Sequence, residues 1–136
     1  MPKKLEVRKS SIYGKGCFAL VPFARRKKIA AYAGEMLQGK RRINRRQEAQ
    51  SAPKIISINE ELAIDGAAGG DETAYINHSC EPNAYMRAAP GNKVLFFALR
   101  DIQAGEEITI NYRDPEHPLV CKCGAQSCRS NSARQA

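Results

Sequence analysis

The clearest chemical signal in this chain of 136 residues comes from its cysteines. Cys121, Cys123 and Cys128 follow a Cys-x-Cys-x(4)-Cys spacing near the end of the sequence. The five cysteines cannot all pair with one another, and a tight cluster of this kind is typical of metal binding rather than of disulfides. Because a structural zinc site closes with four ligands in a tetrahedron, the three thiolates predict a zinc ion and require one further ligand.

That fourth ligand has three candidates, which lie in separate parts of the chain: Cys80, Cys17 and His117. Cys17 directly follows a turn with two glycines, and we expect it to be a small core residue. Cys80 lies in the most distinctive stretch of the sequence, Tyr75-Ile76-Asn77-His78-Ser79-Cys80-Glu81-Pro82-Asn83. Taken alone, the polar residues of this stretch are also compatible with a plain surface turn.

Three other groups of residues could take part in binding or catalysis. The turn Gly14-Lys15-Gly16 allows backbone to approach a ligand closely, although it lacks the third glycine of a dinucleotide site. Tyr32 and Tyr112 carry hydroxyl groups that can orient a reacting nitrogen, but each alone also fits a half-buried strand aromatic. The block Gly105-Glu106-Glu107-Ile108-Thr109-Ile110-Asn111-Tyr112 is more specific, because two glutamates follow a turn glycine at a set distance from a tyrosine.

In this order, these elements resemble the motifs of SET-domain protein lysine methyltransferases. The matching words are Gly14-Lys15-Gly16, Tyr32-Ala33-Gly34, Ile76-Asn77-His78-Ser79-Cys80, the block from Gly105 to Tyr112, and the post-SET cysteines. The resemblance covers about residues 5–130. It implies a mostly β SET-domain fold with several small β-sheets, a knot-like crossing and few short helices over residues 5–115. Residues 116–136 would form a small zinc-bound post-SET tail.

The resemblance also implies roles for individual residues. Tyr112 would be the catalytic tyrosine, and Tyr32 would line the channel for the substrate lysine. The residues implied in binding S-adenosylmethionine are Tyr13, Lys15, Gly16, Tyr75, Asn77, His78 and Tyr112. The residues implied in holding one zinc ion are Cys80, Cys121, Cys123 and Cys128.

Methyl transfer to lysine explains why such residues suffice. The donor sulfonium is already activated, so the protein must position the two reactants and supply a neutral amine. Free lysine has a pKa near 10.4, so only about one amine in a thousand is neutral at pH 7. An aromatic channel that removes water from the ammonium lowers this pKa.

Two departures from the family pattern favour an alternative function. Ala74 stands where the family usually has arginine, and the stretch Pro53-Lys54-Ile55-Ile56 lacks the usual second channel tyrosine. Ile110 stands at a position that affects how many methyl groups are added. The alternative function is a catalytically weak or inactive SET scaffold that acts as a zinc-containing module binding DNA or protein.

The rest of the chain predicts short elements that position these residues. We expect strands near residues 5–10, 18–21, 29–32, 55–58, 62–64 and 107–112, and a short exposed helix within 39–50. Residues 84–87 and 93–99 flank Pro90-Gly91-Asn92, which predicts a hairpin. Many short strands with one weak helix predict a mostly β fold in a single domain with a small tail.

The uneven distribution of charge along the chain indicates which kinds of partner it could bind. The net charge is +8, and residues 1–46 carry +12 whereas residues 47–136 carry −4. The basic first third is either a solvated surface or a face that contacts nucleic acid. A lysine-bearing protein or peptide, including a histone tail, would instead approach a group of acids: Asp65, Asp71, Glu72 and Glu116.

The sequence also bears on where the protein acts. No stretch reaches the roughly 18 apolar residues of a membrane span, and the first residues lack the apolar core of a signal peptide. We therefore expect no membrane contact and an intracellular protein, which is cytoplasmic, or nuclear and chromatin-associated in a eukaryote.

Overall fold

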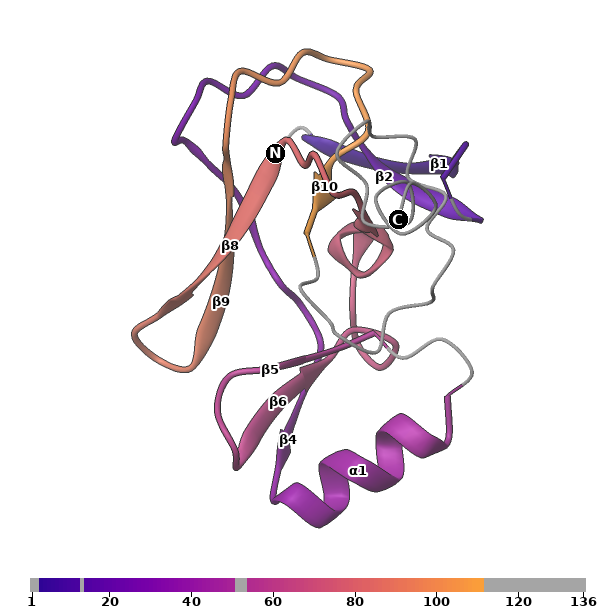
Figure 1. Cartoon of the computed structure of the whole chain (residues 1–136), viewed down its shortest axis with the longest axis vertical. Helices are drawn as coiled ribbons and strands as arrows, with labels where there is room; N and C mark the ends of the chain where they lie inside the picture. Colours follow the sequence, from indigo (N-terminus) through magenta and orange to yellow (C-terminus); the bar gives the residue numbers. More distant parts are fainter. Residues whose placement is uncertain (1–2, 13, 51–53, 112–136) are drawn as a thin grey trace, which may run out of the picture.

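Ten short strands and two helical segments make up the part of the chain that the structure describes, residues 3–12, 14–50 and 54–111 of a computed structural model (Figure 1). The expectation of a mostly β fold built from small sheets is confirmed. The elements in chain order are β1 (Leu5–Lys9), β2 (Lys15–Ala19), β3 (Lys28–Ala31), β4 (Glu35–Gln38), α1 (Lys40–Glu48), β5 (Ile55–Ser57), β6 (Leu62–Asp65), the 3-10 helix η1 (Glu72–Tyr75), β7 (Asn77–His78), β8 (Ala84–Ala89), β9 (Lys93–Ala98) and β10 (Thr109–Ile110).

The strands form four separate sheets. Two have three strands, in the orders β3-β9-β8 and β4-β6-β5, and two are pairs, β1-β2 and β10-β7. Figure 1 shows the β8–β9 hairpin on one side, β1 and β2 at the top of the other side, and β4, β5 and β6 beside α1 at the bottom. The segment with η1 and β7 lies between these groups, so several sheets border it.

The β8–β9 hairpin agrees with the prediction from its turn residues. Gly91 and Asn92 both adopt positive φ angles, 83° and 58°, which glycine and asparagine tolerate better than most residues. Along β9, Val94, Phe96 and Ala98 are buried while the residues between them are more exposed. This alternation places one face of the hairpin against the core.

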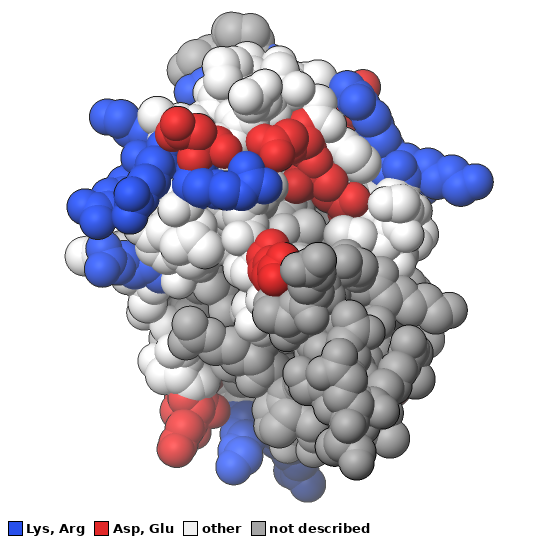
Figure 2. All heavy atoms as spheres, turned by 45° about the horizontal axis from the view of Figure 1, so that its top comes forward, with Lys and Arg blue, Asp and Glu red and all other residues white. Residues whose placement is uncertain are grey.

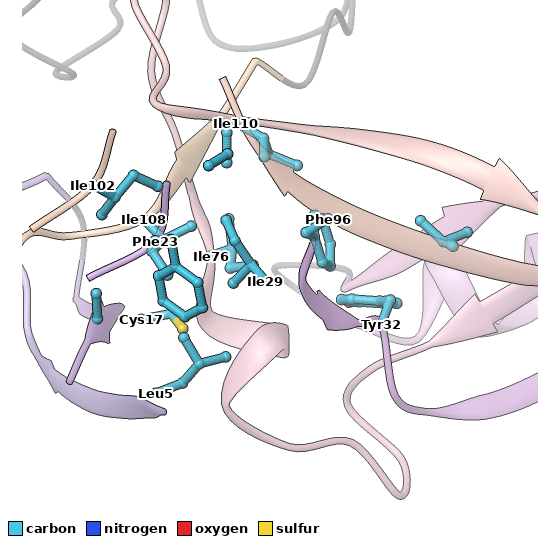
Figure 3. Close-up of a cluster of buried hydrophobic side chains, with 14 of the residues drawn as sticks. Leu5, Cys17, Phe23, Ile29, Tyr32, Ile76, Phe96, Ile102, Ile108 and Ile110 are labelled. Atoms are coloured by element: carbon cyan, nitrogen blue, oxygen red, sulfur yellow. The ribbon is translucent and has the colours of Figure 1, made fainter. Parts of the chain in front are cut away.

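One main core joins β1, β2, β3, β9 and the segment after η1 (Figure 3). Cys17 is fully buried there beside Leu5 and Phe23, as Figure 3 shows. Burial and nearby carboxylates raise the pKa of the Cys17 thiol to about 12. Because zinc binds the thiolate, this environment opposes Cys17 as the fourth zinc ligand and confirms it as a core residue.

A second, smaller core fixes α1 to its sheet. Ile43 of α1 packs with Leu37 and Ala63 of β4 and β6. An Arg46 nitrogen lies 2.8 Å from a carboxylate oxygen of Asp65, which has no exposed surface. Asp65 therefore anchors the helix, and the expectation that it lines an acidic approach for a substrate is wrong.

The remaining expected strands differ mainly in their bounds. The strand expected at 18–21 begins at Lys15 and ends at Ala19, because residues 15–19 pair in register with β1. Within residues 107–111, only Thr109 and Ile110 are in strand conformation. Strand β4 was not expected from the sequence and forms by pairing with β6. The division into residues 5–115 and 116–136 stays a prediction.

The basic residues of the first third do not share one element. Arg8 belongs to β1, whereas Arg41, Arg42 and Arg45 belong to α1, and Figure 1 shows β1 and α1 toward opposite ends of the view. On the face shown in Figure 2, basic groups lie on several separate parts of the surface with carboxylates between them. Contact with nucleic acid stays a prediction. In the described part of the chain, no helix is both long enough and apolar enough to cross a membrane.

Candidate active site

Glu107 connects three segments that are distant in the sequence. Its carboxylate accepts hydrogen bonds from Ser10 Oγ, at 2.7 and 2.9 Å, and from Asn77 Nδ2 at 2.9 Å. The same Asn77 nitrogen lies 3.1 Å from the carbonyl oxygen of Lys15. The glycine turn before β2, the polar stretch at β7 and the glutamate block before β10 therefore meet at one place.

The two turn glycines are required by different constraints, a close contact at Gly16 and a positive φ angle at Gly14. A Cβ on Gly16 would lie 2.3 Å from Oε2 of Glu107, so a side chain there would displace the carboxylate. Gly14 has a φ of +43°, but a Cβ there would meet no atom of the described residues within 4 Å. Gly16 thus permits close packing of the turn against Glu107, and Gly14 provides the turn conformation.

Strand β7 holds the two polar residues that the resemblance assigns to the methyl donor. Asn77 and His78 are both buried and pair in parallel with Thr109 and Ile110 of β10. The Nε2 atom of His78 lies 3.3 Å from Sγ of Cys80, which is partly exposed. Strand β7 therefore carries a buried amide and a buried imidazole, and the imidazole lies beside a partly exposed thiol.

Asn83 fixes the end of the same stretch to the approach of β10. Its side-chain nitrogen donates to the carbonyl of Glu107 at 2.8 Å, and its side-chain oxygen accepts from the N–H of Thr109 at 2.9 Å. Its own N–H donates to Thr109 Oγ1 at 3.3 Å. Residues 107–110 are therefore held both by β7 and by Asn83. The knot-like crossing stays a prediction.

Tyr32 is buried on the other side of η1. Its ring meets Phe96 edge to face, with centroids 5.8 Å apart, and both rings lie at the right of Figure 3. Its hydroxyl donates to the backbone carbonyl of Lys54 and lies so close to Gly66 that a Cβ on Gly66 would be 2.3 Å away. These contacts set the position of the hydroxyl.

Lys54 links Tyr32 to Tyr75. Its ammonium donates to the carbonyl of Ala74 at 2.9 Å and lies 4.7 Å from the centroid of the Tyr75 ring. Burial lowers the pKa of this ammonium below its usual value. The structure thus places the Lys54 amine against the ring of Tyr75, which lies two positions before the start of β7.

The predicted site residues fall into two groups and a remainder. Lys15, Gly16 and Asn77 lie at the junction at Glu107. His78 follows Asn77 in β7 and has Cys80 beside its ring, whereas Tyr32 and Tyr75 lie around Lys54. The others lie outside the described residues: Tyr13, Tyr112, Cys121, Cys123 and Cys128. In the part of the chain that the structure describes, no three His, Cys, Asp or Glu side chains group to hold a metal ion.

Four residues with contacts at this site had no assigned role in the sequence analysis: Ser10, Lys54, Asn83 and Glu107. Asn83 and Glu107 lie inside recognised motifs, and this was the only signal that pointed to them. The only sequence signal at Lys54 is that its stretch lacks the channel tyrosine that the family usually has. Nothing in the local sequence distinguished Ser10 from other serines.

Comparison with known proteins agrees with this geometry. The SET domain family profile matches residues 14–113. The chain is 32% identical over 136 residues to the H3 lysine-4 specific histone-lysine N-methyltransferase of Schizosaccharomyces pombe, covering 93% of this chain and 15% of that protein. It is 32% identical over 129 residues to the histone-lysine N-methyltransferase trithorax of Drosophila virilis, covering 89% of this chain and 3% of that protein.

Human histone-lysine N-methyltransferase SETD1A is 29% identical over 138 residues, covering 95% of this chain and 8% of that protein. Among solved structures, a humanized mutant of the Chaetomium thermophilum Polycomb Repressive Complex 2 bound to the inhibitor GSK126 matches with a TM-score of 0.73 and 26% identity. That match covers 84% of this chain and 15% of the other chain. The chain therefore spans a small part of the length of each relative, and it belongs to the SET-domain family.

Proposed function

We propose that this chain transfers a methyl group from S-adenosylmethionine to the side-chain amine of lysine in a protein, with histone or histone-like tails as the substrate class. The observation that carries the proposal is the junction at Glu107. It joins the glycine turn, the Asn77-His78 strand and the glutamate block through hydrogen bonds of 2.7–3.1 Å. The contact among these three SET motifs supports a common site, and relatives named as histone-lysine N-methyltransferases support the reaction class.

The residues at the junction fit a methyl donor with an amino-acid end. Lys15 is exposed and offers a cation for a carboxylate, and Glu107 offers an anion for an ammonium group. A Cβ on Gly14 would meet no described atom within 4 Å. S-adenosylmethionine would supply the activated methyl group, and Gly16, Asn77 and His78 would border it, together with Tyr13, Tyr75 and Tyr112.

The protein's own part in the reaction is to orient the acceptor amine and keep it neutral. Tyr32 has a hydroxyl whose position is set by neighbours on both sides, and Phe96 backs its ring. Aromatic side chains around a lysine exclude water and so favour loss of its proton before transfer. Tyr112, which follows the block at β10, would aim the nitrogen lone pair at the methyl group.

The tail would complete the donor site by binding a structural zinc ion together with Cys80. Cys80 is the described member of the proposed ligand set, and its partly exposed thiol beside His78 is accessible to a metal. Cys121, Cys123 and Cys128 would supply the other three thiolates. Binding at Cys80 would attach the tail three residues from Asn77, so metal removal should weaken binding of the methyl donor.

The alternative of an inactive scaffold predicts that the methyl donor does not bind. Relatives named as histone-lysine N-methyltransferases favour the enzyme over the scaffold. Acting on histones would place the protein at chromatin. Contact with nucleic acid through the basic first third remains a separate proposal, whose candidates are the bases of α1.

Transfer of tritiated methyl to histones tests the function. We expect label on histone lysine that disappears in Tyr112→Phe and persists in Tyr85→Phe, since Tyr85 stacks on Phe97 in the outer hairpin. Calorimetry with S-adenosylmethionine provides the independent measurement. An absence of binding at millimolar donor would refute the proposal in favour of the scaffold.

Zinc content provides the test for the tail. Metal analysis of the purified chain should find one zinc ion, with weaker retention in Cys80→Ser. Cys17→Ser is the matched control, because Cys17 lies in the apolar core and should not affect zinc affinity. Unchanged zinc affinity in Cys80→Ser would show that the fourth ligand lies elsewhere.

A further inference from the structure

Lys54, which directly precedes β5, has its side chain and its backbone fixed by different partners. The Nζ atom donates to the carbonyl oxygen of Ala74 at 2.9 Å and lies 4.7 Å from the Tyr75 ring centroid. The backbone carbonyl of the same residue accepts the hydroxyl of Tyr32. The amine is therefore directed inward, between the proposed channel tyrosine and the segment that leads into β7.

The surroundings of this amine are unusual for a structural lysine. A partly buried ammonium is normally paired with a carboxylate. In the described part of the chain, no carboxylate oxygen lies within 4.0 Å of the Lys54 nitrogen. The amine instead contacts a neutral carbonyl and the face of a ring, which hold a cation weakly and also accommodate a neutral amine.

These surroundings match two requirements of the proposed reaction, a desolvated amine and contact with an aromatic ring. The reaction needs a lysine amine that is desolvated, contacts an aromatic ring and lies next to the methyl donor. Burial lowers the pKa of Lys54, so a larger share of its amine is neutral than for a lysine in water. Ala74, which Lys54 contacts, lies three residues before Asn77 of the proposed donor site.

We propose that the amine of Lys54 occupies the position of a substrate lysine and is methylated by the active site of the same molecule. This inference rests on the proposed function, because it uses the same methyl donor and the same site. It assigns Lys54 as a modification site and adds self-methylation to the activities of the chain. It also explains why a lysine is accommodated in a stretch where the family usually has an aromatic residue.

The chemical step balances without any further reactant. The lone pair of the neutral Nζ attacks the methyl carbon of S-adenosylmethionine, and a nitrogen–carbon bond forms as the sulfur–carbon bond breaks. The electron pair of the broken bond stays on sulfur, which changes from a sulfonium to a neutral thioether. The methylated nitrogen, now an ammonium, can release a proton to water.

Mass spectrometry of the full-length chain tests the proposal. The purified protein is incubated with S-adenosylmethionine carrying a deuterated methyl group, together with histones in the same tube, and the modified lysines are mapped. We expect label on Lys54. Because the step occurs within one molecule, the fraction of chains labelled per minute should not change over a hundredfold dilution of the enzyme.

Two substitutions provide the matched comparison. Lys54→Arg retains the positive charge but removes the acceptor amine, so label should disappear from the chain. Lys93→Arg changes an exposed lysine in β9 and should leave self-labelling unaltered. The mapping on the unsubstituted chain requires no variant, so the test does not depend on whether Lys54→Arg folds.

The outcomes separate this inference from the proposed function. Labelled histones with an unlabelled Lys54 would overturn the inference and leave the function standing. A labelling rate at Lys54 that falls in proportion to enzyme concentration would also overturn it, because one molecule would then be modifying another. If neither histone nor chain acquires label, both the function and this inference fall.

Discussion

Replacement of Gly16 by alanine should damage the site mainly through its contact with Glu107, since the next neighbour, Ser10 Cβ, lies farther away at 3.1 Å. The added Cβ would lie 2.3 Å from Oε2 of Glu107 and 2.7 Å from its carboxyl carbon, far inside van der Waals contact. The neighbour is the end of a flexible side chain, so Glu107 can swing away. When it does, Asn77 Nδ2 and Ser10 Oγ both lose a carboxylate acceptor that lies within 2.9 Å.

The size of the effect follows from those lost bonds. A hydrogen bond to a charged group contributes about 1.5–3 kcal/mol, and part of the loss is recovered when water reaches Ser10. We therefore expect Gly16→Ala to lower the free energy of unfolding by about 2–4 kcal/mol, measured by urea denaturation. Binding of S-adenosylmethionine, measured by calorimetry, should weaken at least about tenfold, since about 1.4 kcal/mol corresponds to one factor of ten.

A double-mutant cycle tests the cause. In a Glu107→Ala background the clashing carboxylate is absent, so Gly16→Ala should cost about 2 kcal/mol less than in the original chain. Gly14→Ala is the control, because its cost of about 1 kcal/mol comes from a positive φ and should be the same in both backgrounds. An equal cost of Gly16→Ala with and without Glu107 would refute the reasoning.

Three further substitutions follow from buried polar contacts, each measured by urea denaturation. Asn83→Ala should cost about 2–4 kcal/mol, because a carbonyl and an N–H beside β10 lose their partner, and a cost below about 1 kcal/mol would contradict this. Tyr32→Phe should cost about 1 kcal/mol through loss of the hydroxyl bond to the Lys54 carbonyl, and an unchanged stability would show that water replaces it. Burial opposes ionisation of Asp65, but hydrogen bonds from Arg46 and other donors outweigh it and hold its pKa below the usual 3.8. The ionised carboxylate therefore stabilises the fold above about pH 4, and this contribution is lost as the pH falls through the lowered pKa, so the stability gap between the original chain and Asp65→Asn should narrow in acid. A gap that widens in acid would reverse the assigned sign.

Local signals in the sequence predicted the elements that depend on local chemistry. The turn at Pro90-Gly91-Asn92 predicted the β8–β9 hairpin, since its residues accept positive φ angles. The polar run of helix formers after Gly39 predicted α1. The ordered motifs predicted the family, because they match the motifs of SET domains in residue type and in order.

Contacts between distant residues were beyond the reach of the sequence. Ser10 and Glu107 are 97 positions apart, so no local pattern marks them as partners. Asp65 follows a strand and precedes glycine, a pattern equally typical of an exposed turn, yet packing of α1 buries it against Arg46. Strand β4 needs β6 as its neighbour before its short segment becomes a strand.

The sequence by itself determined the family, because the chain carries the SET motifs in their order. Only the tertiary structure decided which of these side chains meet and which unassigned residues join them. Glu107 became the junction of three motifs, and Lys54 became an amine held against Tyr75. The physical reason is that chemical identity belongs to single residues, whereas burial, pairing and a shifted pKa arise only when the fold brings separate segments together.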